Sequence, residues 1–230
     1  MIYYVCKYAP VELFKGFGQE CAVLEEMPEN FDKSDKIAHA NLCGFGKSVI
    51  QAVLEGKVEE LVLVNCCDSM RRVYDIIENT KKCKFLYMLD LPHEDNECEN
   101  IKFAQSILRL KKAYERYSQR KFDRELFIKS FTQPQQERKP YIGLLGVHVS
   151  SILEKTIREN MQMDVENMTC TSGRNLIILQ KDLRNMDDET LFLAYAESLL
   201  GQMPCARMNN NTRRNQLFLD PSLKGIIYHT

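Results

Sequence analysis

Long apolar runs are absent from this sequence: no segment approaches the roughly 18 apolar residues that a membrane-spanning helix requires. The N-terminal residues also lack the basic start, apolar stretch and small-residue cleavage site of a secretory signal, so we expect a cytoplasmic protein without a membrane partner. An excess of basic charge is absent as well, because 31 Lys and Arg side chains balance 32 Asp and Glu side chains at a net charge of −1. Proteins that bind nucleic acid normally carry a basic patch or stripe, and this balance therefore predicts no nucleic-acid partner.

Paired CxxC motifs are the third absence, although the chain contains nine cysteines. Without such pairs, neither a zinc ribbon nor a thioredoxin-type redox site fits the sequence. Disulfides rarely persist in the cytosol, which leaves two interpretations open for scattered cysteines. They are small buried apolar residues, or they are ligands of a soft metal that converge only in the folded chain. The nine are Cys6, Cys21, Cys43, Cys66, Cys67, Cys83, Cys98, Cys170 and Cys205.

Short apolar segments alternate with amphipathic stretches along the chain, a pattern typical of βαβ units. The aliphatic run at residues 61–64 predicts a strand buried on both faces of a parallel sheet. We therefore predict the α/β class, with two Rossmann-like (flavodoxin-like) units that are each a doubly wound parallel sheet. A polar segment marks a boundary, giving an N-terminal domain at 1–135 and a second α/β domain at 136–230. Strands are expected at residues 2–6, 21–25, 61–64, 85–91, 141–146 and 225–228, and helices at 11–18, 42–54, 68–79, 100–117, 150–161 and 187–200.

Two cysteines of the first domain occupy positions where parallel α/β sheets place ligands. Cys67 follows the strand at 61–64 and precedes a helix, which is the carboxyl end of a parallel strand. Cys43 lies in a glycine-containing stretch that leads into the next helix, and glycines let the backbone approach a bulky group. Free N–H groups and the helix dipole stabilise a thiolate at a helix N-terminus. The pattern indicates a two-cysteine metal site, with ordinary core cysteines as the alternative.

Two further patterns favour structural roles. Gly46, Lys47 and Ser48 imitate the end of a phosphate-binding P-loop, but Asn41 occupies the position of its first glycine. The four histidines lack the spacing of a helical metal site. His148 is the histidine best placed to face a cleft, and a hydrogen-bonded structural histidine is the alternative.

The ordered series of motifs resembles a known family. Residues 41–48 and 64–75, which contain Cys43 and Cys67, are similar to the two cluster-binding stretches of the 2-hydroxyacyl-CoA dehydratase and benzoyl-CoA reductase family. The similarity extends over essentially the whole chain. Further matching stretches are residues 8–13, 169–174, 203–208 and 225–229.

This resemblance implies that Cys43 and Cys67 ligate a [4Fe–4S] cluster, while the neighbouring Cys66 belongs to the core. Family members place a third cysteine beyond the stretch that matches residues 225–229. We therefore expect that the C-terminal part of the family pattern is missing and that the second domain is incomplete. Cys205 is the candidate for the third ligand, and an isolated chain is expected to hold a cluster poorly or not at all.

The later motifs supply candidates without a firm role. Cys170 falls in a family motif and is not assigned as a ligand. Gly173 and Arg174 are candidate contacts for a CoA phosphate, with a plain surface turn as the alternative.

In function, the resemblance implies a lyase subunit of the D-component type that removes water from an (R)-2-hydroxyacyl-CoA. One-electron reduction of the thioester gives a ketyl radical that expels the neighbouring hydroxyl group. The implied partners are a related second subunit or a second copy of the chain, and an iron–sulfur ATPase activator that delivers the electron under anaerobic conditions. Two alternatives stay open: a double-cubane-cluster reductase of the same fold acting on small molecules, and a non-catalytic scaffold subunit.

Overall fold

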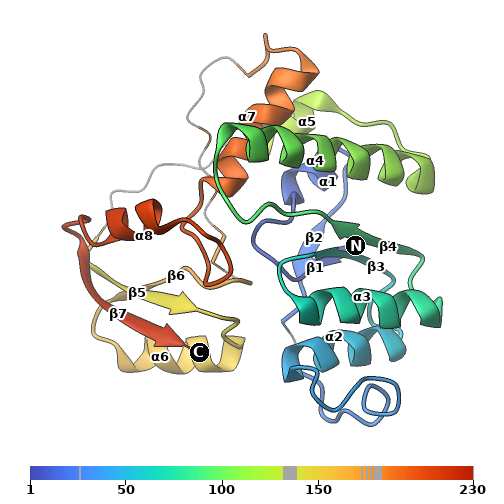
Figure 1. Ribbon diagram of the computed structural model, residues 1–230, viewed down its shortest axis with the longest axis horizontal. Helices are drawn as coiled ribbons and strands as arrows, with labels where there is room; N and C mark the ends of the chain where they lie inside the picture. Colours follow the sequence, from blue (N-terminus) through green and yellow to red (C-terminus); the bar gives the residue numbers. More distant parts are fainter. Residues whose placement is uncertain are drawn as a thin grey trace.

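Two parallel β-sheets organise the computed structural model, which describes residues 1–25, 27–131, 139–171, 173, 174, 176, 178 and 183–229 (Figure 1). The first sheet has four strands in the order β2-β1-β3-β4, and the second has three in the order β6-β5-β7. All pairings in both sheets are parallel. Helices alternate with these strands along the chain, so the predicted α/β class with two doubly wound, flavodoxin-like units is confirmed.

Strand β3 (Glu60–Val64) is buried on both faces of the first sheet, as its aliphatic run predicted. Side chains of a strand alternate between the two faces. Leu61 and Leu63 accordingly join one hydrophobic cluster, while Val62 and Val64 join another. The other strands of this sheet are β1 (Ile2–Tyr4), β2 (Cys21–Val23) and β4 (Phe85–Leu89).

Helices cover the two faces of this sheet unequally. Helices α2 (Gly44–Leu54) and α3 (Asp68–Thr80) pack against Leu61 and Leu63. The opposite face carries α1 (Val11–Lys15), α4 (Glu97–Ser118) and α5 (Arg124–Lys129). In the ranges that the structure describes, no helix combines the length and the apolar character needed to cross a membrane.

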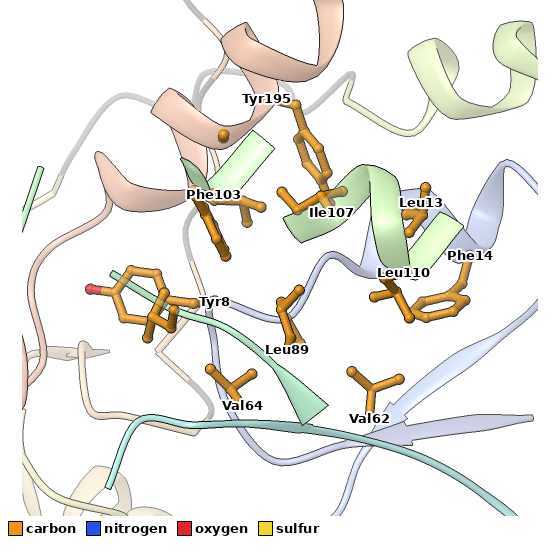
Figure 2. Packing of buried hydrophobic residues seen from close by; sticks show 14 of the residues in the cluster. Tyr8, Leu13, Phe14, Val62, Val64, Leu89, Phe103, Ile107, Leu110 and Tyr195 are labelled. Atoms are coloured by element: carbon orange, nitrogen blue, oxygen red, sulfur yellow. The ribbon is translucent and has the colours of Figure 1, made fainter. Parts of the chain in front are cut away.

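Helix α4 provides much of the larger hydrophobic cluster. Its buried side chains Phe103, Ile107 and Leu110 recur at helical spacing and point toward the sheet. Figure 2 shows them above Val62 and Val64, which lie on the facing side of β3. This packing fixes the position of β3 and therefore of the cysteines that follow it.

Helix α7 (Asp188–Leu200) packs against α4, although it follows the strands β5 and β6 in the chain. The ring of Phe127 in α5 lies 5.2 Å from that of Phe192 and 5.1 Å from that of Tyr195, both in α7. The first sheet is thus covered partly by the second half of the chain. The domain boundary predicted at residue 135 lies outside the described residues.

The second sheet consists of β5 (Tyr141–Gly146), β6 (Asp164–Asn167) and β7 (Leu223–His229). Helix α6 (Ser151–Asn160) packs on one face and α8 (Asn211–Leu217) on the other. Gly146 ends β5 with a φ of +116°, and a Cβ atom at this position would collide with the carbonyl oxygen of His229. Only glycine allows the ends of β5 and β7 to approach this closely.

The strand orders define where ligands bind. In the first sheet, β1 lies between β2 and β3, the two strands that follow it in the chain, and in the second sheet β5 lies between β6 and β7. The connections to these following strands therefore run in opposite directions from β1 and from β5. This reversal is a topological switch point, and open α/β sheets bind ligands at the carboxyl ends of the strands there. In Figure 1 the arrows of β5 and β7 point toward the unit that contains the first sheet. The carboxyl ends of β1 and β3, and of β5 and β7, are therefore the places to search for a site.

Candidate functional site

The cysteines Cys43 and Cys67 are the N-cap residues of α2 and α3. The Cys43 sulfur accepts a hydrogen bond from the Gly46 amide at 3.4 Å, and its side chain is exposed. A Cβ atom on Gly46 would lie 3.1 Å from Val73 of α3, which shows how closely the two helices approach at this end. The expected placement of both cysteines at helix starts is therefore observed.

The thiols of Cys67, Cys66 and Cys6 form a chain of contacts, in which Cys66 contacts both of the others. A hydrogen bond with Cys66, reinforced by burial, raises the pKa of Cys67, although the charge of Arg207 lowers it in part. A hydrogen bond with Cys6 is the main cause that raises the pKa of Cys66. Cys66 also packs against both hydrophobic clusters, in keeping with its predicted place in the core. Neighbouring thiols thus outweigh the helix N-terminus at Cys67, and a metal ligand at this position must first lose its proton.

Lys7 is buried where segments from the second half of the chain meet this edge. Its amide donates to the carbonyl of Cys170 at 3.0 Å, and its ammonium group donates to the carbonyls of Met168 at 2.9 Å and Met203 at 2.6 Å. Burial lowers the pKa of Lys7, while the nearby Cys205, Cys6 and Cys170 raise it. No carboxylate pairs with this ammonium group among the residues described. The predicted ligand Cys205 is buried in this environment.

The three predicted ligands do not form a ready metal site. Within the described ranges, no three side chains among His, Cys, Asp and Glu are grouped to hold a metal ion. Cys43 and Cys67 both lie at helix N-termini, a position that suits a metal-bound thiolate, although Cys67 would have to lose its proton against the effect of Cys66. Cys205 lies with Lys7 in the core. The residues present therefore offer two of the thiolate ligands that a cluster needs, and ligation by Cys43, Cys67 and Cys205 together stays a prediction.

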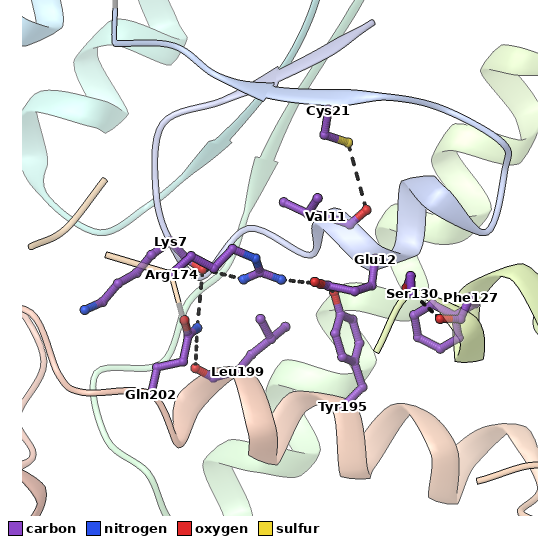
Figure 3. A network of polar contacts seen from close by, with 10 residues as sticks. All are labelled: Lys7, Val11, Glu12, Cys21, Phe127, Ser130, Arg174, Tyr195, Leu199 and Gln202. Atoms are coloured by element: carbon purple, nitrogen blue, oxygen red, sulfur yellow. Dashed lines mark hydrogen bonds and ion pairs between the residues drawn. The ribbon is translucent and has the colours of Figure 1, made fainter. Parts of the chain in front are cut away.

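Arg174 lies in a buried polar network (Figure 3). Its guanidinium group donates to the carbonyl of Lys7 at 2.6 Å and forms an ion pair with Glu12. The Tyr195 hydroxyl donates to the same Glu12 carboxylate at 2.8 Å. A Cβ atom on Gly173 would lie 2.5 Å from the backbone of Met168, so glycine is required there by close packing. The contact of Gly173 and Arg174 with a CoA phosphate stays a prediction, and the guanidinium group already binds Glu12 and the Lys7 carbonyl inside the fold.

His148 follows β5 and contacts the first unit. Its ring stacks on Phe45 of α2 with centroids 4.0 Å apart, and Nδ1 lies 2.9 Å from the Thr171 hydroxyl. Its Nε2 atom is buried without a hydrogen-bond partner in the described part of the chain. Burial, helped by the charge of His229, lowers the pKa of His148 to about 4. The imidazole is therefore uncharged at neutral pH, and its ring packs on Phe45 at the contact between the two units.

This neutral histidine predicts a loss of stability in mild acid. Between the ordinary histidine pKa of about 6.5 and the folded value of about 4, the unfolded chain binds a proton that the folded chain does not. The free energy of unfolding should therefore fall as the pH decreases through this window. His148→Gln should show a smaller fall between pH 7 and pH 4.5 in urea unfolding. The exposed His39→Gln is the control and should behave as the wild type; an equal fall in all three proteins would contradict this explanation.

The fold and the cysteines at the carboxyl ends of the first sheet define the class of protein. It is an α/β protein of two flavodoxin-like units with cysteines at a topological switch point. The family described as 2-hydroxyglutaryl-CoA dehydratase, D-component, matches residues 6–144, and the chain belongs to this family. The matched range includes Cys43 and Cys67 and ends in β5. A search of curated proteins found no match.

Proposed function

We propose that this chain is the iron–sulfur subunit of a 2-hydroxyacyl-CoA dehydratase. Membership in the family supports a subunit of the dehydratase type, without specifying its cofactor or mechanism. The observation that carries the finer proposal is the placement of Cys43 and Cys67 at the N-termini of two helices that pack side by side. In this proposal both side chains bind a [4Fe–4S] cluster as thiolates.

The surrounding charges favour an anionic group. Thiolates bound to iron carry negative charge, and helix N-termini stabilise negative charge through free N–H groups and the helix dipole. Lys7 is buried beside Cys6, Cys170 and Cys205, and the charge of Arg207 acts on Cys67. Arg207 offsets part of the rise in the pKa of Cys67, and Lys7 offsets part of the rise in the pKa of Cys170.

When bound, a cluster of this kind would supply single-electron transfer and Lewis acidity. That chemistry suits the removal of a hydroxyl group next to a thioester, because the C3 hydrogen is not acidic without prior reduction. The proposal includes a related second subunit or a second copy of the chain, and an ATP-dependent activator as the electron source. The chain's own contribution is to hold the cluster at the edge of the first sheet and to exclude water from its buried side.

Anaerobic iron and sulfide analysis tests this proposal. After reconstitution and desalting, we expect equal amounts of iron and acid-labile sulfide, with less than one cluster per chain because the proposal gives the cluster only two cysteine ligands. Two cubanes per chain would instead indicate the double-cubane reductase. The sequence left open that an isolated chain holds no cluster, but this proposal is narrower and expects partial loading. A colourless preparation without iron would therefore contradict it and favour a scaffold subunit.

A further inference from the structure

A cavity of about 170 Å³ lies at the switch point of the second sheet. It is bounded on one side by the ends of β5 and β7, which are paired in register at Leu145 and Tyr228. The segment around Cys205 and the side chain of Arg214 in α8 form the other side. The lining residues are Leu145, Gly146, Pro204, Ala206, Arg214 and Tyr228. The strand order alone therefore marks this cavity as a place for a ligand.

Arg214 brings an uncompensated positive charge to the cavity. Its Nη2 atom donates to the carbonyls of Cys205 at 2.8 Å and Met208 at 2.6 Å, and Nη1 donates to the Asn211 side chain at 3.1 Å. These neutral acceptors hold the guanidinium plane in place but do not neutralise it. No carboxylate pairs with Arg214 in the part of the chain that the structure describes.

The neighbouring Arg213 shows the opposite arrangement. Its guanidinium group forms an ion pair with Asp95 at 2.7 Å and a hydrogen bond from Nε to the same carboxylate at 2.8 Å. Of these two consecutive arginines in α8, Arg213 is thus paired with a carboxylate, whereas Arg214 is not paired with any carboxylate that the structure describes. The unneutralised arginine is the one that lines the cavity at the strand ends.

The other walls limit what can bind. Leu145, Pro204 and Ala206 are apolar, and Tyr228 is 61% exposed. The cavity is smaller than the roughly 300–1,000 Å³ typical of sites that enclose a whole drug-sized ligand. It suits a compact anion attached to a larger molecule that continues outside. Guanidinium groups bind phosphate with well-aligned, charge-assisted hydrogen bonds.

We propose that this cavity binds a phosphate group, with Arg214 as its charge partner. The assignment of that phosphate to coenzyme A rests on the proposed dehydratase function; free phosphate is the other source. Arg214 would then fill the role that the sequence suggested for Arg174, whose guanidinium group is bound to Glu12 and Lys7.

Calorimetric titration of the full chain with four probes tests the inference. The probes are coenzyme A, its 3′-dephospho form, pantetheine without phosphate, and inorganic phosphate. We expect coenzyme A to bind and Arg214→Gln to weaken binding roughly tenfold or more, because a charge-assisted contact is lost. Arg214→Lys, which keeps the charge without the planar fork, should give an intermediate affinity and serves if the glutamine variant does not fold. Arg213→Gln is the matched control and should leave the affinity unchanged.

The outcomes separate the site from the function. Arg214-dependent binding of inorganic phosphate without binding of coenzyme A would support the cavity as a phosphate site and count against the dehydratase proposal. Equal binding of coenzyme A by wild type and Arg214→Gln would overturn the inference while leaving the proposed function intact. Failure of the wild type to bind either coenzyme A or phosphate would also overturn the inference. Weaker binding of the 3′-dephospho form than of coenzyme A would identify the 3′-phosphate as the bound group, whereas equal binding of these two with loss of binding by pantetheine would identify the pyrophosphate.

Discussion

Replacing Arg174 with methionine is expected to lower the free energy of unfolding by about 3–5 kcal/mol, the typical effect of removing one member of a buried ion pair. The side chains of Arg174 and Glu12 are only 14% and 6% exposed. Without the guanidinium group, the Glu12 carboxylate would be left in the core, with the Tyr195 hydroxyl as its remaining side-chain donor among the residues that the structure describes. Because whole domains are stable by about 5–15 kcal/mol, this single change should be visible at once in urea unfolding.

Two further variants show whether burial causes the effect. Arg184 pairs with Glu125 at the surface, with exposures of 65% and 54%, so Arg184→Met should change the stability by less than about 1 kcal/mol. Adding Glu12→Gln to Arg174→Met removes the unpaired charge and should recover part of the loss. If Arg174→Met lowered the free energy of unfolding no more than Arg184→Met does, the buried ion pair of Arg174 and Glu12 would not stabilise the fold as proposed.

Replacing Cys43 or Cys67 with serine is expected to reduce the iron retained after anaerobic reconstitution by roughly tenfold or more. Loss of even an outer partner of a metal ligand typically costs ~10–100-fold in affinity, and loss of the ligand itself should cost at least as much. Serine keeps the approximate size of the side chain but offers a hard oxygen in place of a soft sulfur. Iron content of the desalted proteins, measured side by side with the wild type, provides the comparison.

Cys83→Ser is the matched control for the iron measurement. Cys83 is half-buried like Cys67, and burial raises its pKa to about 11, but it lies before β4 at the opposite edge of the sheet. Its replacement should leave the iron content unchanged, and the same is predicted for Cys6, Cys21 and Cys98. Cys6 is the most informative of these because its thiol contacts Cys66. A loss of half the iron or more in any of these four variants would show that the ligands are assigned to the wrong cysteines.

Much of the fold could be predicted because its signals are local. The aliphatic run of β3 and the amphipathic spacing of α4 lie within short windows of the sequence, and both elements are where they were expected. Strand β6 and helices α5 and α8 were not predicted. In β6 only Val165 is buried, so this edge strand has no apolar run. The two helices were short, yet the side chains of Asp123 and Asn210 cap them, and that capping signal could have revealed both.

The site was predictable only in part, because its remaining features depend on tertiary contacts. The positions of Cys43 and Cys67 at helix starts follow from glycines and strand ends close to them in the sequence. The burial of Lys7 depends on carbonyl groups of Met168 and Met203, which are 161 and 196 residues away. No local sequence pattern predicts contacts between residues so far apart in the chain. The engagement of Arg174 by Glu12, across 162 residues, escaped the sequence for the same reason.

Electron paramagnetic resonance of the anaerobically reconstituted and dithionite-reduced chain reports directly on the type of cluster and on its ligands. The proposal is that Cys43 and Cys67 hold a [4Fe–4S] cluster at the N-termini of α2 and α3. We expect the signal of a reduced [4Fe–4S] cluster in the wild type and in Cys83→Ser, and its loss in the Cys43→Ser, Cys67→Ser double variant. An undiminished signal in the folded double variant, or no signal in the wild type, would contradict this proposal.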